Sequence, residues 1–327
     1  MCADLGALVA ERATQAAEDP GPRALAEGLV AQADGTIQVL LFFGSRRSGA
    51  HTDRFSAYDL FVLVDDYRSF YRALRRSGAV TRPALLLAAV SRLLPPSQVS
   101  FRTGPAAEEL QAKCAIISAR QFERETGSAR RDHFCVARLF QATQLLYARD
   151  LSARQLTLRG LERAHRLTFE WVRPWLPESF DAADYTRKLL EVSLAAEIRP
   201  EPTGRSRLLW EAQSEYLLAV YPELLRELSE AGQLTGLPEG RYRLPLPVSA
   251  GQRLRVRTYF AWSLLRATAR WAKHMLTFEG WLDYIARKAT RHTGQAIQLT
   301  SRERRWPLVF LWPRVVRYLR AKNRMGK

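Results

Sequence analysis

The chain has 327 residues, nearly half of them apolar, which is enough for one large or two smaller domains with a buried core. No apolar run approaches the roughly 18 residues of a membrane-spanning helix, and the N-terminus lacks the basic and apolar regions of a secretory signal. Three cysteines and five histidines show no metal-ligand spacing, so we expect reduced thiols in a cytosolic protein.

The formal net charge of +17 is concentrated at one end of the chain. Residues 253–327 contain 18 lysines and arginines and three acidic residues, a net charge of +15 that leaves +2 for the first 252 residues. A segment with this excess of positive charge requires a polyanionic partner, either nucleic acid or an anionic membrane surface.

In chain order, the first expected elements are a helix and two strands. Residues 23–32 have the spacing of an amphipathic helix. Residues 39–43 form a continuous apolar run that Gly44 ends, which predicts a strand covered on both faces. A second apolar run, 59–64, begins at Asp59 and predicts a second strand.

The turn between these two strands has the residues of a phosphate site. Gly44 allows the backbone to approach a ligand closely, and Ser45 offers a hydroxyl and an N–H to phosphate oxygens. An acid at the start of the next strand, Asp59, would then hold Mg²⁺ against the same phosphates. This order of strand, Gly-Ser and acidic strand is typical of the nucleotidyltransferase fold.

Two features leave a second interpretation of this segment open. Nucleotidyltransferases usually have a pair of aspartates two residues apart, and the residue two before Asp59 is Ala57. Gly, Ser and Asp are also common in turns, so an ordinary hairpin with a solubilising acid is the alternative.

The rest of the chain is expected to be mainly helical. Residues 113–118 are rich in β-branched side chains and predict a short strand, and 233–251, rich in Gly and Pro, predict a linker. Helices are predicted at 67–76, 83–94, 131–150, 153–175, 182–198, 206–228, 256–276, 277–293 and 306–324.

These elements predict an α/β fold: a nucleotidyltransferase domain with a mixed sheet, a mainly helical domain, and a basic amphipathic C-terminal segment. The expected boundaries are 1–125 for the first domain and 126–232 for the helical domain. The linker at 233–251 then leads to a basic, membrane-associating helical region at 252–327.

Several motifs, in the same order along the chain, resemble one family, the mitochondrial-type CDP-diacylglycerol synthases (the translocator assembly and maintenance family of phosphatidate cytidylyltransferases). They are Gly44-Ser45, the strand from Asp59 to Val-Asp-Asp at 64–66, and Lys-Cys-Ala-Ile-Ile-Ser at 113–118. Phe-Cys-Val-Ala-Arg-Leu at 134–139 and Pro-Glu-Ser-Phe at 177–180 follow. The chain resembles a divergent bacterial member, and this family also lacks the first aspartate of the usual pair.

The resemblance implies that the chain transfers CMP from CTP to phosphatidate, giving CDP-diacylglycerol and pyrophosphate. It implies catalytic roles for Asp59, Lys113 and Arg138, with Asp59 holding Mg²⁺. Gly44, Ser45, Arg46 and Lys113 would bind the nucleotide. The expected location is cytoplasmic, peripherally bound to the inner face of the plasma membrane.

The C-terminal segment interleaves aromatic residues with arginines, which suits an amphipathic helix at a membrane interface. The residues expected to contact lipid or membrane are Lys288, Arg291, His292, Trp306, Trp312 and Arg317. The same composition would also suit stacking on nucleic acid bases, which we consider less favoured, or a helix that covers the core.

Two other functions remain open from the sequence. One is a nucleotidyltransferase that acts on RNA or another phosphorylated acceptor, with the basic C-terminus binding phosphates. The other is a catalytically inactive relative that binds membrane or RNA, because Ala57 removes one expected metal ligand. The oligomeric state is left open.

Overall fold

A computed structural model describes residues 4–16, 19–49, 57–104, 109–195, 204–277 and 300–305. The chain divides into two compact units, Met1–Thr277 and Phe278–Lys327. The first unit contains every element discussed below. In the second unit, the described residues form the short helix α13 (Ser301–Arg305). The domain boundaries inside the first unit stay predictions.

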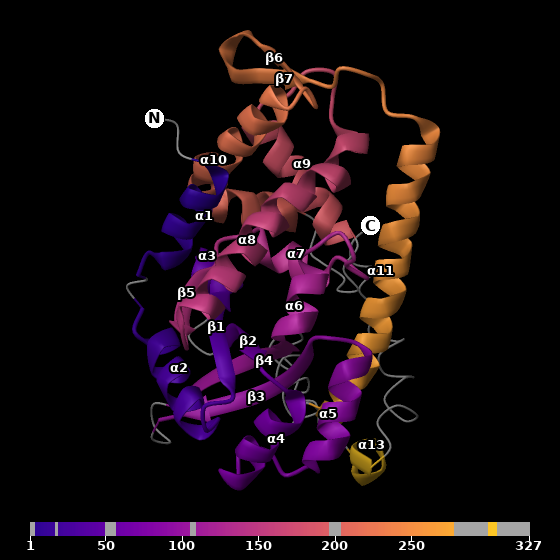
Figure 1. Ribbon diagram of the computed structural model, residues 1–327. Coiled ribbons are helices and arrows are strands. Elements are labelled where there is room, and N and C mark those ends of the chain that lie inside the picture. The colour runs from indigo at the N-terminus through magenta and orange to yellow at the C-terminus, as the bar shows by residue number, and fades with distance from the viewer. Residues whose placement is uncertain are drawn as a thin grey trace. The chain divides into compact units, whose positions relative to one another are not determined.

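The first unit is built around a mixed five-stranded sheet with the order β3-β4-β2-β1-β5 (Figure 1). Strand β2 pairs with β4 in parallel, and the other neighbours are antiparallel. This confirms the expected α/β class with a mixed sheet and helices after it. The strands are β1 (Ile37–Phe43), β2 (Tyr58–Val64), β3 (Ser97–Thr103), β4 (Leu110–Ser118) and β5 (Gln144–Ala148).

Helices cover both faces of this sheet, so β1 and β2 are apolar on both sides. One face packs against α2 (Gly21–Gln32), α4 (Tyr67–Arg76) and α5 (Ala84–Leu93). The other face, with Phe61 and Leu63 of β2, belongs to a larger core. That core includes side chains of α1 (Leu5–Thr14), α6 (Ala119–Glu125), α7 (Phe134–Leu139), α8 (Leu151–Val172), α9 (Ala182–Ala195) and α10 (Arg205–Glu230).

Most predicted elements that fall on described residues are confirmed because local patterns specify them. The helix predicted at 306–324, and all but the first residue of that predicted at 277–293, lie outside the described residues. The strands predicted at 39–43, 59–64 and 113–118 correspond to β1, β2 and β4. The helix predicted at 67–76 has the observed bounds of α4, and the side chain of Asp66 caps it by accepting a hydrogen bond from the backbone N–H of Ser69 at 3.0 Å. Cys114 and Cys135 are buried free thiols, and burial raises the pKa of both.

The single long helix predicted at 131–150 is wrong, because this range forms the short helix α7 and then the edge strand β5. The change of direction is stabilised by Gln213 of α10, which is buried. Its side-chain oxygen accepts from the backbone N–H of Ala142 at 3.2 Å, and its amide donates to the side chain of Gln141 at 3.0 Å. Both this contact and the pairing of β5 with β1 join residues far apart in the sequence, so helical periodicity gave no sign of them.

The range 233–251, expected to be a linker, contains a small hairpin. Strands β6 (Thr235–Leu237) and β7 (Arg241–Arg243) pair around the turn η3 (Pro238–Gly240). The backbone groups of Tyr242 and Phe180 exchange hydrogen bonds of 2.8 and 3.0 Å. The Gly and Pro residues therefore form the turn of a hairpin that packs against the segment following the 3-10 helix η2 (Arg173–Trp175).

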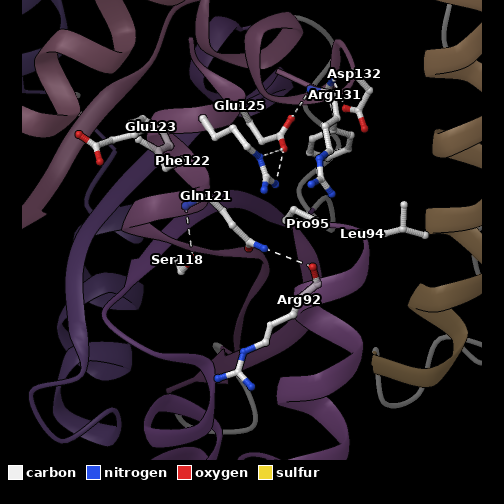
Figure 2. A network of polar contacts seen from close by, with 12 residues as sticks. Arg92, Leu94, Pro95, Ser118, Gln121, Phe122, Glu123, Glu125, Arg131 and Asp132 are labelled. Atoms are coloured by element: carbon white, nitrogen blue, oxygen red, sulfur yellow. Dashed lines mark hydrogen bonds and ion pairs between the residues drawn. The ribbon is translucent and has the colours of Figure 1, made fainter. Parts of the chain in front are cut away.

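Polar contacts of α6 connect this helix with α5, with β4 and with the loop before α7 (Figure 2). The hydroxyl of Ser118 accepts from the backbone N–H of Gln121, whose side chain donates to the carbonyl of Arg92. The buried carboxylate of Glu125 accepts from the backbone N–H of Arg131 at 2.9 Å and from Arg124 at 3.0 Å. These bonds join α6 to the end of β4 and to α5, and they join the loop at 126–133 to α6.

The long helix α11 (Ala250–Thr277) follows the hairpin and corresponds to the helix predicted at 256–276. It packs against β3, α5 and η2. Within the residues that the structure describes, no helix is both long and apolar enough to span a membrane.

Candidate functional site

The turn after β1 brings the backbone of Gly44 against the side chain of Asp59. Gly44 has φ +86° and ψ −168°, a region that is essentially restricted to glycine. A Cβ at this position would lie 2.6 Å from Oδ2 of Asp59 and 3.2 Å from Cγ. The sequence suggested glycine here for a close approach to a ligand, and the structure shows a close approach to the carboxylate.

Strand register places Lys113 next to Asp59. In the parallel pair of β2 and β4, Asp59 lies opposite Lys113, and on the other side Asp59 lies opposite Phe43 of β1. Neighbouring strands are about 4.8 Å apart, and residues in register point to the same face of a sheet. An anionic and a cationic side chain, both partly buried, therefore share one face at the end of the sheet where Gly44 lies.

Two further polar residues, which the sequence motifs did not indicate, extend this face. Ser100 of β3 lies opposite Lys113, and the side chain of Gln111 donates to the Ser100 hydroxyl at 3.1 Å. Strand β3 alternates polar and apolar residues, with Val99 and Phe101 in the core on the opposite face. This alternation with a period of two was the signal that could have identified the strand and its polar face.

Ser45 begins the short helix α3 (Ser45–Ser48), in which the carbonyl of Gly44 accepts from the backbone N–H groups of Arg47 and Ser48. The side chain of Arg46 lies on Tyr58, with its guanidinium carbon 4.1 Å from the ring centre, and its Nη1 lies 4.0 Å from the carboxylate of Asp19. Tyr58 belongs to the core on the face opposite Asp59. Arg46, predicted to bind the nucleotide, thus contacts side chains of the other face.

Arg138 lies on α7, over the same sheet face as Asp59. Its guanidinium carbon is 3.6 Å from the centre of the Phe134 ring, and its Nη1 donates to the Phe134 carbonyl at 3.1 Å. Phe134 in turn contacts Phe61 edge to face, with ring centres 6.4 Å apart. Because Phe61 follows Asp59 by two residues on β2, α7 places Arg138 beside the strand that carries Asp59.

The donors available for a cation are few. Within the described residues, no group of three or more His, Cys, Asp or Glu side chains is placed to hold a metal ion. Mg²⁺ is commonly held by one or two carboxylates together with phosphate oxygens and water. Asp59, whose carboxylate lies at the space that a Cβ on Gly44 would fill, fits as one such ligand, and the phosphates of a nucleotide would supply others.

The six residues expected to contact lipid or membrane lie outside the described residues: Lys288, Arg291, His292, Trp306, Trp312 and Arg317. Cys2 also lies outside them. The structure therefore leaves the membrane assignment of the C-terminal segment as a prediction.

Comparison with known proteins gives little further information. No protein-family profile matches the sequence, and no curated protein matches it. Among solved structures, the chain is similar to a STING-associated CdnE c-di-GMP synthase from Capnocytophaga granulosa, with 11% sequence identity over 82% of this chain and 86% of that one, and a TM-score of 0.21. A similarity at this level carries no argument about function, which must come from the site itself.

Proposed function

We propose that the protein is a nucleotidyltransferase that transfers CMP from CTP to phosphatidate. The observation that supports this most is the group at one end of the sheet: Gly44 in a conformation reserved for glycine, with Asp59 against it and Lys113 in register beside Asp59. A glycine turn, a carboxylate and an ammonium group in this order are what a triphosphate and its metal ion require.

In the proposed reaction, an anionic phosphate oxygen of phosphatidate attacks the α-phosphorus of CTP. A new P–O bond forms, the bond from the α-phosphorus to the bridging oxygen breaks, and its electron pair leaves with pyrophosphate. Because the nucleophile is already anionic, no strong general base is required. This agrees with a site in which Asp59 is accompanied by cations and neutral polar groups.

The residues of this chain would act mainly by positioning and by neutralising charge. Lys113 would stabilise the negative charge that develops on the pyrophosphate. Gly44 and Ser45 would bring backbone N–H groups to the phosphates. Mg²⁺, held by Asp59, would supply further neutralisation of the triphosphate.

The identity of the acceptor is supported by the resemblance in sequence and by the charge distribution. A net charge of +15 over residues 253–327 would attract an anionic membrane, where phosphatidate resides. We therefore place the protein at the cytoplasmic face of the membrane as a peripheral protein. The experiment must distinguish transfer to phosphatidate from transfer to RNA and from the absence of any transfer by an inactive relative.

The test is incubation of the full-length protein with Mg²⁺, radiolabelled CTP and vesicles that contain phosphatidate. Label should appear in the lipid phase, and Asp59→Asn should abolish it while circular dichroism shows an intact fold. Parallel reactions contain labelled ATP, GTP or UTP, and RNA in place of lipid. Label in RNA and none in lipid would show that RNA is the acceptor and phosphatidate is not. No transfer to either would indicate a binding protein.

A further inference from the structure

A cluster of cationic side chains is buried where α11 meets the loop before α7. Arg266 Nε donates to the carboxylate of Asp132 at 2.8 Å, and Arg270 pairs with the same carboxylate oxygen. Arg270 Nε also donates to the carbonyl of Pro95 at 3.1 Å. Asp132 lies beside α11 at the upper right of Figure 2. Arg270 and Asp132 are 1% and 3% exposed, so these charges are shielded from water.

One turn further along α11, Lys273 continues the cluster. Its Nζ donates to the carbonyl of Pro96 and to the hydroxyl of Ser97, both at 3.0 Å, and to the carbonyl of Leu94. Burial, followed by the nearby guanidinium groups of Arg270 and Arg266, lowers the pKa of Lys273 to about 6. Its Nζ donates all three of these bonds, and so it attaches α11 to the turn after α5.

Two guanidinium groups of this cluster share one carboxylate. Arg266 and Arg270 carry two positive charges, and both pair with the same oxygen of Asp132. Burial opposes ionisation of Asp132, but Arg270 and Arg266 outweigh it and lower its pKa, so it is ionised. Among the residues that the structure describes, the cluster therefore keeps a positive charge in excess of its shared carboxylate, and burying such an excess is unfavourable unless a further anion joins it.

Two buried nitrogen atoms of the cluster are also unsatisfied. Nη2 of Arg266 and Nδ1 of His274 have no hydrogen-bond partner among the described residues. Burial and then the neighbouring basic side chains of Lys273, Arg270 and Arg138 lower the pKa of His274 well below 6.5. A neutral imidazole in a positive field is suited to donate an N–H to an anion that enters it.

The cluster adjoins the candidate site through one aromatic ring. Phe134 has the guanidinium carbon of Arg138 at 3.6 Å and that of Arg270 at 4.6 Å from its centre. The same ring contacts Phe61, two residues beyond Asp59 on the same strand. Both guanidinium groups thus contact one ring that packs beside the strand carrying Asp59.

We propose that Arg138, Arg270 and His274 bind the phosphomonoester of the acceptor substrate. The positive charge in excess of Asp132 favours an anion, and guanidinium groups are the preferred partners of phosphate oxygens. The position next to Asp59 would direct this phosphate toward the nucleotide. The identity of the ligand as the acceptor rests on the proposed function, whereas the binding of a phosphomonoester does not.

The first test is calorimetric titration of the full-length protein, without nucleotide or Mg²⁺, with dihexanoyl phosphatidate, glycerol 3-phosphate and dihexanoyl phosphatidylcholine. Both phosphomonoesters should bind, and the phosphodiester should not. Arg138→Gln and His274→Gln should each weaken binding about tenfold or more, the effect of losing one hydrogen bond to a charged group. Arg255→Gln, an exposed arginine on the same helix, is the control and should bind as the wild type does.

Arg138→Lys, which keeps the charge, should bind more tightly than Arg138→Gln, and circular dichroism checks that each variant is folded. Equal binding of phosphatidylcholine, or folded variants that bind like Arg255→Gln, would overturn the proposal. Glycerol 3-phosphate binding as tightly as phosphatidate would support the phosphomonoester site and indicate a soluble acceptor.

The second test separates this site from that of the nucleotide. In the transfer assay, His274→Gln should raise the KM for dihexanoyl phosphatidate and leave the KM for CTP unchanged. A rise in the KM for CTP alone would assign the cluster to the triphosphate and refute the inference. If the wild type transfers no nucleotide, the proposed function fails, but the titration still decides whether the cluster binds phosphate.

Discussion

Replacing Gly44 by alanine tests whether the contact between Gly44 and Asp59 organises the site. The new Cβ would lie 2.6 Å from Oδ2 of Asp59, and ordinary contact begins at 3.4 Å, so one of the two groups must move by about 0.8 Å. A displacement of about 1 Å in a catalytic group can lower a rate about 100-fold. We therefore expect Gly44→Ala to lower kcat for CMP transfer by about two orders of magnitude.

The substitution also carries a cost for the backbone. At φ +86° and ψ −168°, a side chain costs about 1–3 kcal/mol of folding free energy. Gly35→Ala is the matched control, because Gly35 also has a positive φ, +71°, but nothing lies within 4 Å of the position that its Cβ would take. Its expected loss is about 1 kcal/mol, with no effect on transfer.

Urea denaturation gives the free energy of unfolding of each variant, and the vesicle assay gives the transfer rate. Both variants should be folded and destabilised, and only Gly44→Ala should lose transfer. A Gly44→Ala protein that transfers CMP as fast as Gly35→Ala would show that the position of the Asp59 carboxylate does not matter. The phosphate site would then have to lie elsewhere.

Other predictions address single contacts. Lys113→Ala should lower kcat about 100-fold, which is the usual loss when one preorganised donor to developing charge is removed, and should change the urea midpoint little. A wild-type kcat would show that Lys113 has no catalytic role. Burial lowers the pKa of His165 from 6.5 to about 4, so the folded state resists its protonation and stability should fall as pH drops through this range. Between pH 6.5 and 5 this amounts to about 2 kcal/mol, which His165→Gln should remove from the pH dependence of urea unfolding; an unchanged dependence would contradict it. Gln213→Leu should cost about 1–3 kcal/mol, because the backbone N–H of Ala142 loses its partner; a urea midpoint like that of the wild type would show that this bond does not hold the end of α7.

The central part of the candidate site could be predicted from sequence because its signals are local. The apolar runs at 39–43 and 59–64, the intervening Gly44-Ser45 and the acid at 59 are each visible within a few residues. A short, continuous apolar run that ends at turn residues is typical of a strand buried on both faces. β1 and β2 therefore form where they were expected. The same holds for α4, whose apolar spacing and Asp66 cap lie within its own segment.

Long-range contacts decided what these signals left open. The sequence selected Lys113 through a resemblance, and the parallel pairing of β2 with β4 is what places it opposite Asp59. The range 131–150 had helical spacing, yet pairing with β1 and the bond from Gln213 divided it into α7 and β5. Strand pairing and side-chain bonds between distant residues leave no periodic trace in either segment.

The sequence by itself therefore determined the strand-turn-strand unit, most helices and the unequal distribution of charge. Only the tertiary structure decided which charged residues meet. Arg266 and Arg270 belong to a helix that composition described as simply basic, and packing of α11 on the loop at Asp132 buries them. The energetic consequence of a charge depends on its burial and its partners, and both are properties of the folded chain.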